Sequence, residues 1–505
     1  MSNTIEQFMW PYQRTFRGTA QVDADKLFGS VDSALAPQIF LIGYRMDGDL
    51  SKHPICIEPE QNTILGNREL RPADLNAAFT GASFSFSNSR EGQLEYSDRA
   101  VGQRVQMRAM RRSLANATAN CLNSLHTTTN SSKHFCSATT RVGDYEVLVV
   151  LQLAGRAYEL YPKLHKAVKD ELRICTSLLD GMIDEFLAEH AQRLEGEEPG
   201  RDLADRRRDA DELMRRAGRQ FSLSVGFAAS EIEGAHQLFE VCESVAAMKY
   251  EGAEGNGSLV VCRRDHPCID VEVAFQEAIA LVEHRGVRKL IEAASGGRCL
   301  FTDGKVIYGI GRTADSYSGI TEDLYRIAFR RQHAWEVFHD KHLMMRVVNG
   351  VPQLPRESGL EKMFVEAFAR QFKTSDTRAA KGIWRLVSYA AGLSRGFTVA
   401  ISTAANDESK RLGGQGVSIS PTSLTESLIE LATSIDGAVL LTPDGVCHAF
   451  GIILDGVASS GGLRSRGSRY NSAARYCAGA QASTLVVIAS EDGMVDFLEG
   501  GSTSM

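Results

Sequence analysis

Long hydrophobic runs are missing from this 505-residue chain. The longest apolar candidate extends only from Val147 to Leu151, far short of the roughly 18 residues that a membrane-spanning helix needs. We therefore expect no membrane partner. The sequence starts at Met1 with a polar segment and lacks the basic and apolar leader of a secretory signal, which predicts a cytoplasmic protein.

An excess of positive charge is also missing. The chain has 56 Lys and Arg against 63 Asp and Glu, which gives a formal net charge of −7. Such a chain has no overall attraction to DNA or to acidic membranes, so nucleic-acid binding would require a local basic patch. The composition therefore argues against DNA as a partner.

The ten cysteines show no paired framework, and most of them lie among apolar residues. This pattern favours buried thiols over disulfides. Cys262 and Cys268, with His266 between them, could be read as a metal cluster. The five intervening residues do not match the common zinc spacings, so buried thiols remain the preferred interpretation.

The length suggests about two to four domains of mixed α and β structure. Apolar periodicity predicts strands at residues 38–44, 55–58, 147–153, 397–402, 438–441 and 484–489. It predicts helices at residues 104–122, 154–189 and 359–372, and a further helix that Ser420 and Pro421 open as cap and first residue. Residues 404–416 are expected to form a polar loop. Arg108, Arg111 and Arg112 form either a phosphate-binding face or a solvated helix surface, and the solvated surface is favoured.

Two stretches of the chain share one order of elements. Residues 290–310 and 431–452 each run from a helix end through a glycine-bearing turn into a strand, an Asp-Gly turn and a second strand. A second pair of matching segments follows, residues 330–350 and 469–493. We hypothesise a diverged internal copy, although a helix followed by a hairpin is also a common pattern in unrelated proteins. Gly296 or Gly297 stands where the later stretch has Asp436, so the earlier copy should be structural or sensory.

The later stretch carries the residues that suggest chemistry on phosphate. Asp436 and Gly437 stand between a helix and the strand that Ala438 begins. A carboxylate in this position either holds Mg²⁺ or Mn²⁺ against phosphates or simply caps a turn, and Gly437 lets backbone approach a substrate closely. The following Asp444-Gly445 is read as a plain turn.

A glycine- and serine-rich segment, residues 456–467, follows the hairpin and ends with Arg466 and Gly467. Free backbone N–H groups and guanidinium groups could bind an anion there, and the N-terminus of the helix that Ser468 and Arg469 start would favour phosphate as well. The alternative is a flexible surface loop with solvated arginines. A P-loop is excluded, because no Gly-rich segment ends in Gly-Lys followed by Ser or Thr.

These motifs together resemble the diadenylate cyclase domain family of the DisA N-terminal type. The family's motifs are Asp-Gly-Ala, Gly-Thr-Arg-His-Arg-Ala-Ala and Ser-Glu-Glu-x-Gly, and their counterparts here begin at Asp436, Gly467 and Ser490 in the same order. The resemblance covers about residues 359–501. It implies a mixed α/β domain that condenses two ATP into cyclic di-AMP, with two such domains meeting face to face.

The resemblance also implies roles for individual residues. Asp436 matches the aspartate that binds the metal, Mg²⁺ or Mn²⁺, and readies the 3′-hydroxyl, and Arg469 matches a phosphate-binding arginine with a catalytic role. The implied nucleotide-binding residues are Gly437, Ala438, Arg466, Gly467, Ser468, Asn471, Ser490 and Glu491. Tyr470 and Asn471 depart from the pattern, because the family has His and Arg there, and a neutral phenol is a poor substitute for a metal-binding imidazole.

The expected fold is therefore α/β, with a C-terminal mixed-sheet cyclase-like domain flanked by helices and preceded by α+β regulatory domains. We assign residues 1–256 to a regulatory or sensor region, 257–355 to a degenerate cyclase-like copy and 356–505 to the catalytic domain. ATP and a second copy of the chain are the expected partners. The alternative is a nucleotide-binding sensor or scaffold that retains the fold with reduced catalysis, which Tyr470 and Asn471 favour.

Overall fold

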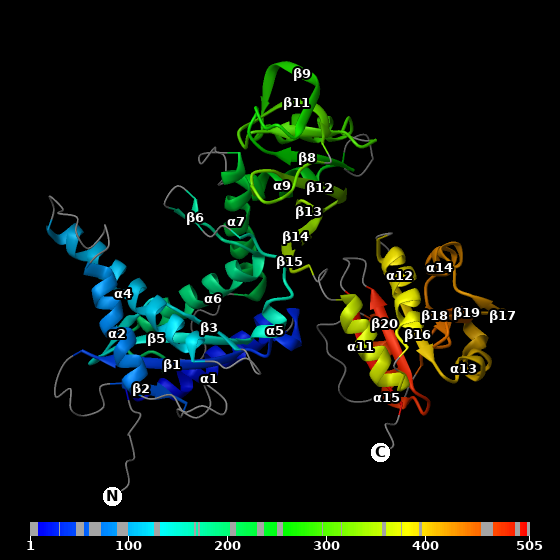
Figure 1. The fold of residues 1–505 in the computed structure, drawn as a ribbon, viewed down its shortest axis with the longest axis horizontal. Coiled ribbons are helices and arrows are strands. Elements are labelled where there is room, and N and C mark those ends of the chain that lie inside the picture. The colour runs from blue at the N-terminus through cyan, green and yellow to red at the C-terminus, as the bar shows by residue number, and fades with distance from the viewer. Residues whose placement is uncertain are drawn as a thin grey trace, which may run out of the picture. The chain divides into compact units, whose positions relative to one another are not determined.

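The computed structural model divides the chain into two compact units, Met1–Leu354 and Pro355–Met505 (Figure 1). The structure describes residues 9–29, 31–46, 55–59, 72–87, 99–125, 132–165, 168–169, 172–201, 209–229, 237–249, 256–294, 296–314, 316–355, 360–374, 376–392, 396–455, 468–489 and 495–501. Within these ranges no helix is both long enough and apolar enough to cross a lipid bilayer.

The first unit begins with a sheet of order β2-β1-β5-β3, with β4 also on β5. Its strands are β1 (Gln38–Arg45), β2 (Ile55–Glu58), β3 (Ser132–Cys136), β4 (Thr140–Val142) and β5 (Tyr145–Ala154). The helices α1 (Gln13–Ala24), α2 (Pro72–Ser87), α4 (Arg99–Ser124) and α5 (Gly155–Tyr158) accompany it. Alternate residues of β1 and β5 enter different core clusters, one of which includes residues of α2 and α4. Burial on both faces explains why these strands read as continuous apolar runs.

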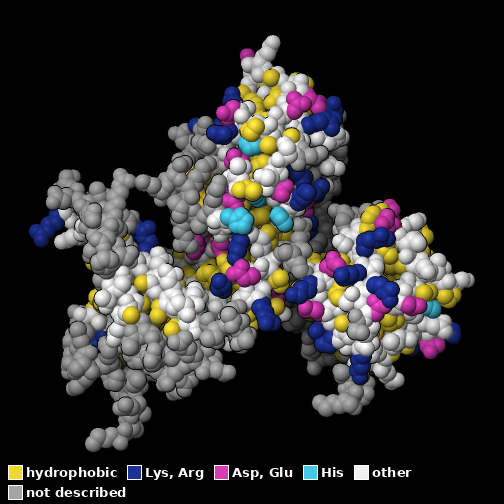
Figure 2. Space-filling view, in the orientation of Figure 1, with side chains coloured by type: hydrophobic (Ala, Val, Ile, Leu, Met, Phe, Trp, Pro, Cys, Tyr) yellow, Lys and Arg dark blue, Asp and Glu magenta, His cyan; other side chains and the backbone are white. Residues whose placement is uncertain are grey.

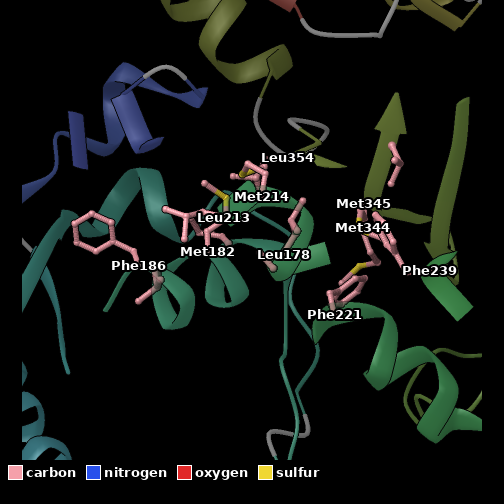
Figure 3. Close-up of a cluster of buried hydrophobic side chains, with 14 of the residues drawn as sticks. Leu178, Met182, Phe186, Leu213, Met214, Phe221, Phe239, Met344, Met345 and Leu354 are labelled. Carbon is pink, nitrogen blue, oxygen red and sulfur yellow. The ribbon is translucent and has the colours of Figure 1, made fainter. Parts of the chain in front are cut away.

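A helical layer connects this sheet to the rest of the unit. It consists of α6 (Leu178–Leu194), α7 (Ala210–Ala228) and α9 (Leu238–Ala247), and a small hairpin of β6 (Val168–Lys169) and β7 (Leu172–Arg173) precedes it. Figure 3 shows Met182, Phe221 and Phe239 in one buried cluster of this layer. The prediction of one helix over residues 154–189 was wrong, because that segment holds α5, the hairpin and the start of α6.

The second sheet of the unit has the order β15-β14-β13-β12-β8-β10-β11-β9. Its strands are β8 (Gly257–Val261), β9 (Ile269–Ala280), β10 (Cys299–Thr302), β11 (Val306–Thr313), β12 (Tyr325–Arg331), β13 (Ala334–His339), β14 (His342–Val348) and β15 (Val351–Gln353), and α10 (His284–Ile291) lies between β9 and β10 in the chain. One face packs against helices, as the contact between Trp335 and Phe239 shows, with ring centroids 5.4 Å apart.

The second unit is a six-stranded sheet between two helical layers. The order is β17-β19-β18-β16-β20-β21, and only the β16–β18 pair is parallel among the pairings described. The strands are β16 (Phe397–Ser402), β17 (Val417–Ser423), β18 (Ala438–Leu441), β19 (Val446–Ile452), β20 (Thr484–Ala489) and β21 (Val495–Gly500). The helices are α11 (Leu360–Phe372), α12 (Arg378–Gly392), α13 (Ala405–Leu412), α14 (Glu426–Thr433) and α15 (Ser468–Gly479).

The two helical layers follow from the alternation along the central strands. Val399 and Val439 enter the core cluster that includes α11, α12 and α14, whereas Ala400 and Leu440 enter the cluster that includes α13 and α15. Successive side chains of a strand point to opposite faces, so each of these strands packs against both helical layers. The α/β class expected for this domain is therefore confirmed.

Two local predictions for this unit were wrong. Ser420 and Pro421 do not open a helix but lie in the edge strand β17, where proline is tolerated. Thr425 caps α14 instead, and its Oγ1 accepts a hydrogen bond from the Leu428 N–H at 3.2 Å. The polar segment 404–416 is not a loop, because most of it forms α13, whose Ala405 and Leu412 reach the core.

Candidate functional site

Asp436 lies in the turn between α14 and β18, at the end of the sheet where β18 begins and β19 ends. Its side chain is 89% exposed. The interior strand β18 begins two residues after Asp436 and is paired on both sides, while the Asp436 carboxylate remains open to solvent. An exposed carboxylate on a rigid scaffold is suited to bind an external group.

The first turn of α15 brings a guanidinium to this carboxylate. Arg469 Nη2 donates to Asp436 Oδ1 at 3.3 Å, and the Arg469 side chain is 36% exposed. The two residues are 33 positions apart in the chain. The structure therefore brings together the two residues that the sequence singled out as catalytic.

Gly437 has a structural reason to be glycine. Its φ is +117°, and a Cβ there would come within 2.4 Å of the Gly451 carbonyl carbon in β19. Gly451 also has positive φ, at +67°. The close passage of these two backbones accounts for Gly437 without a substrate. Ala438 likewise has a buried side chain, in the core cluster beneath α15.

The start of α15 places the remaining described residues. Ser468 is exposed and Asn471 is half-buried. Tyr470 packs partly buried against the cluster that contains Ala473 and Tyr476. The Tyr470 ring therefore contributes to core packing. The other sequence-predicted residues, Arg466, Gly467, Ser490 and Glu491, lie outside the described residues, as does the glycine-rich segment 456–467.

Sequence reasoning missed a hydrogen-bonded group that holds α15. Glu408 in α13 accepts from the Tyr476 hydroxyl at 3.1 Å and from Arg411 Nη2 at 2.7 Å. Arg411 Nη1 also donates to Asp455, after β19, at 2.9 Å. Burial, reinforced by the Glu408 carboxylate, raises the pKa of Tyr476 above its ordinary value, so the phenol stays protonated as the donor. The Glu408/Arg411 spacing of three residues is a helical signal, but the polar composition of the segment favoured a loop.

The single carboxylate of Asp436 suits only a metal ion that a second group, such as a substrate phosphate, also binds. No cluster of three or more His, Cys, Asp or Glu side chains suited to a metal occurs in the described ranges. Asp436 offers one exposed carboxylate, and Mg²⁺ commonly binds through one or two carboxylates plus waters and substrate phosphates. The residues present therefore fit a cation that arrives with a nucleotide.

Cys262, His266 and Cys268 do not form such a cluster. His266 Nε2 lies 3.1 Å from Asp323 Oδ1, and the Cys268 N–H donates to His266 Nδ1 at 3.1 Å. Both ring nitrogens are thus engaged within the protein. Burial, the largest cause, raises the pKa of Cys262 to about 12, as expected for an inert buried thiol.

The surface charges are mixed. On the face drawn in Figure 2, Lys and Arg side chains are interspersed with Asp and Glu on the visible parts of both units. Several form ion pairs, such as Arg370 with Glu499 at 2.5 Å and Arg219 with Glu240 at 2.7 Å.

Three protein-family models match this chain. Residues 387–503 match the family described as DisA bacterial checkpoint controller nucleotide-binding. Residues 9–222 match the probable sensor domain DACNG, and residues 236–341 match the probable sensor domain DACNH. The resemblance drawn from the motifs is thereby confirmed, and it extends to a sensor region before the nucleotide-binding domain.

No curated protein matches the chain. Among solved structures, the chain is similar to DacA from Staphylococcus aureus, in the crystal structure of a double mutant of that protein. The match has 16% sequence identity and a TM-score of 0.20, and it covers 29% of this chain and 91% of that chain.

Proposed function

We propose that this chain, which carries a DisA-type nucleotide-binding domain at residues 387–503 behind sensor domains at 9–222 and 236–341, is a diadenylate cyclase. It condenses two ATP into cyclic di-AMP and pyrophosphate, under the control of the sensor domains. The observation that carries this proposal is the exposed pair of Asp436 and Arg469, 3.3 Å apart within the matched domain.

The proposed chemistry uses this pair directly. The 3′-oxygen of each ATP attacks the α-phosphorus of the other, so that two phosphodiester bonds form. In each attack the P–O bond to a leaving pyrophosphate breaks and the 3′-hydroxyl loses its proton, which gives cyclic di-AMP and two pyrophosphates. In this proposal Asp436 orients that hydroxyl and receives the proton, and Arg469 binds the phosphates. Without nucleotide, Arg469 pairs with Asp436. In this proposal Arg469 exchanges that carboxylate for a phosphate when ATP binds.

Two domains are needed, because in this proposal each holds a single ATP. In-line attack requires the second nucleotide to face the first, which a symmetric pair of domains provides. Self-association through the nucleotide-binding domain is therefore part of the proposal. A bound Mg²⁺ or Mn²⁺, held by Asp436 and the phosphates, would supply charge stabilisation to the leaving group.

A second candidate function rests on Tyr470. The family has a metal-holding histidine at this position, whereas here the tyrosine packs against the α15 core cluster. A domain without this ligand could bind ATP and signal its presence while making little product. On this view the chain is a nucleotide-binding sensor or scaffold of the same fold.

A product assay separates the two functions. Purified protein is incubated at several concentrations with ATP, GTP or both and with Mg²⁺ or Mn²⁺, and products are identified by mass spectrometry. We expect cyclic di-AMP, at a rate per chain that rises with protein concentration. Asp436→Asn should lower the rate by about 100-fold or more, since it removes the proton acceptor.

Asp444→Asn is the matched control. It removes the same charge from the β18–β19 hairpin, at a turn residue on the exposed surface. It should leave the rate unchanged. ATP binding without cyclic product under all conditions would favour the sensor function, and full activity of a strictly monomeric preparation would contradict the paired-domain mechanism.

A further inference from the structure

An arginine-rich face of the second sheet in the first unit is not used by the proposed reaction. In β12, β13 and β14, side chains on one face belong to the main core, among them Ile327 and Val337. Because neighbouring side chains alternate, the residues between them point to the other face. That face carries Arg326, Arg330, Glu336, Phe338 and Arg346, which we call the arginine face.

Glu336 is the centre of the arginine face. Its side chain is only 6% exposed. Oε2 accepts from Arg330 Nε at 2.7 Å, and Oε1 accepts from Arg346 Nε at 2.7 Å. A buried carboxylate needs such partners, and here it fixes two guanidinium groups in defined orientations. The single Glu336 carboxylate thus pairs with both Arg330 and Arg346.

Arg326 adds a third positive charge without a carboxylate of its own. Its Cζ lies 4.2 Å from the centroid of the Phe338 ring, and Arg330 Cζ lies 5.7 Å from the same ring. No ion pair or hydrogen bond of the Arg326 guanidinium occurs within the described part of the chain. Burial, the largest cause, and the charge of Arg330 lower the pKa of Arg326, while the nearby Glu336 carboxylate partly offsets them.

The face therefore carries more positive than negative charge. Three guanidinium groups surround one carboxylate, and the aromatic ring holds Arg326 in place by a cation–π contact. Guanidinium groups present planar, forked donors that match phosphate and carboxylate oxygens, and groups already fixed by Glu336 lose little freedom on binding.

We propose that the arginine face is an anion-binding site of the sensor region, which takes the phosphate group of a small phosphorylated ligand. Arg326 and Arg330 supply the donors, and Glu336 and Phe338 orient them. β12 and β13 lie within the stretch that matches the probable sensor domain DACNH, so the site would give that domain a ligand class. The proposal does not depend on the proposed cyclase activity.

The test uses the full-length chain and inorganic phosphate as the probe. Phosphate is titrated by isothermal calorimetry at constant ionic strength, with chloride as the balancing anion. We expect wild-type binding that Arg326→Gln weakens by about tenfold or more, because a hydrogen-bonded charge pair is lost. Phosphate held by the other unit would remain as a background that this substitution does not change.

Arg312→Gln is the matched control. It removes one positive charge from the same sheet, but Arg312 already pairs with Glu272 at 2.8 Å. It should bind phosphate as wild type does. If Arg326→Gln fails to fold, as judged by circular dichroism, Arg330→Gln replaces it, since that side chain is 44% exposed. Absence of wild-type binding, unchanged binding in the folded variant, or an equal loss in Arg312→Gln would each overturn the proposal.

Discussion

The hairpins β10–β11 and β18–β19, one in each unit, are built alike but begin differently. β10 pairs in parallel with β8 and antiparallel with β11, and β18 pairs in the same way with β16 and β19. The difference lies before the first strand. Asp436 stands there in the second unit, whereas Gly296 and Gly297, both with positive φ, stand there in the first.

The likeness ends after the hairpin. Residues 330–334, which echo residues 469–473 in the sequence, lie at the end of β12 and the start of β13, whereas the later segment forms the first turns of α15. The first unit therefore has no counterpart of the helix that carries Arg469 at this point of its described chain. The degenerate internal copy remains a hypothesis for the hairpin alone. The comparison teaches that the hairpin is a shared scaffold, and that the residues proposed to act on phosphate lie before and after it.

The largest expected effect on stability comes from replacing the glycines that precede the two hairpins by alanine. Gly437→Ala forces a Cβ to within 2.4 Å of Gly451 at a φ of +117°, and we expect it to cost about 3 kcal/mol or more. Gly296→Ala meets no atom within 4 Å at a φ of +62°, so it should cost about 1 kcal/mol. Hydrogen-exchange mass spectrometry on peptides from both hairpins measures the two losses. Equal losses of hydrogen-exchange protection in the two hairpins would show that the close contact between the Gly437 and Gly451 backbones does not contribute to stability.

The two hairpin turns should also differ, by a smaller amount, in how their stability depends on pH. Asp303 accepts from the Lys305 and Val306 N–H groups, both at 3.0 Å, and from Arg264 at 2.8 Å. Burial alone would raise the pKa of Asp303, but these donors outweigh it and hold that pKa below its usual range. A carboxyl with a depressed folded-state pKa stabilises the fold above its unfolded pKa of about 3.9, and the contribution is lost as pH falls towards the folded value.

Asp303→Asn should therefore destabilise β10–β11 by about 1–2 kcal/mol at pH 7 and progressively less below about pH 4. Hydrogen exchange of β10–β11 peptides, corrected for intrinsic exchange at each pH, gives the profile. The same substitution at Asp444, which is exposed in the other turn, is the control and should show no such profile. A pH-independent difference at Asp303 would contradict the assigned cause.

The sequence predicted the apolar strands well and the polar segments poorly. β16, β18 and β20 were predicted with the bounds that the structure has, because they are buried on both faces and have no polar alternation. α13 was missed because the segment 404–416 is polar and contains glycine, although Ala405 and Leu412 lie in the core. At the site, the order of the motifs in the sequence was enough to select Asp436 and Arg469. The hydrogen bond between Glu408 and Tyr476 joins α13 and α15, and no local sequence pattern indicates that these two helices are in contact.

The smallest expected effect on stability concerns the site pair itself. Arg469→Gln should change the free energy of unfolding by less than about 0.5 kcal/mol, because Asp436 is 89% exposed and a solvated ion pair contributes little. The same change should weaken ATP binding by about tenfold, since it removes a charged phosphate contact. Calorimetric titration with ATP and hydrogen exchange of the α15 peptide give the two numbers. A large stability loss with unchanged ATP affinity would make the pair a structural contact and would leave the proposed chemistry without its phosphate-binding arginine.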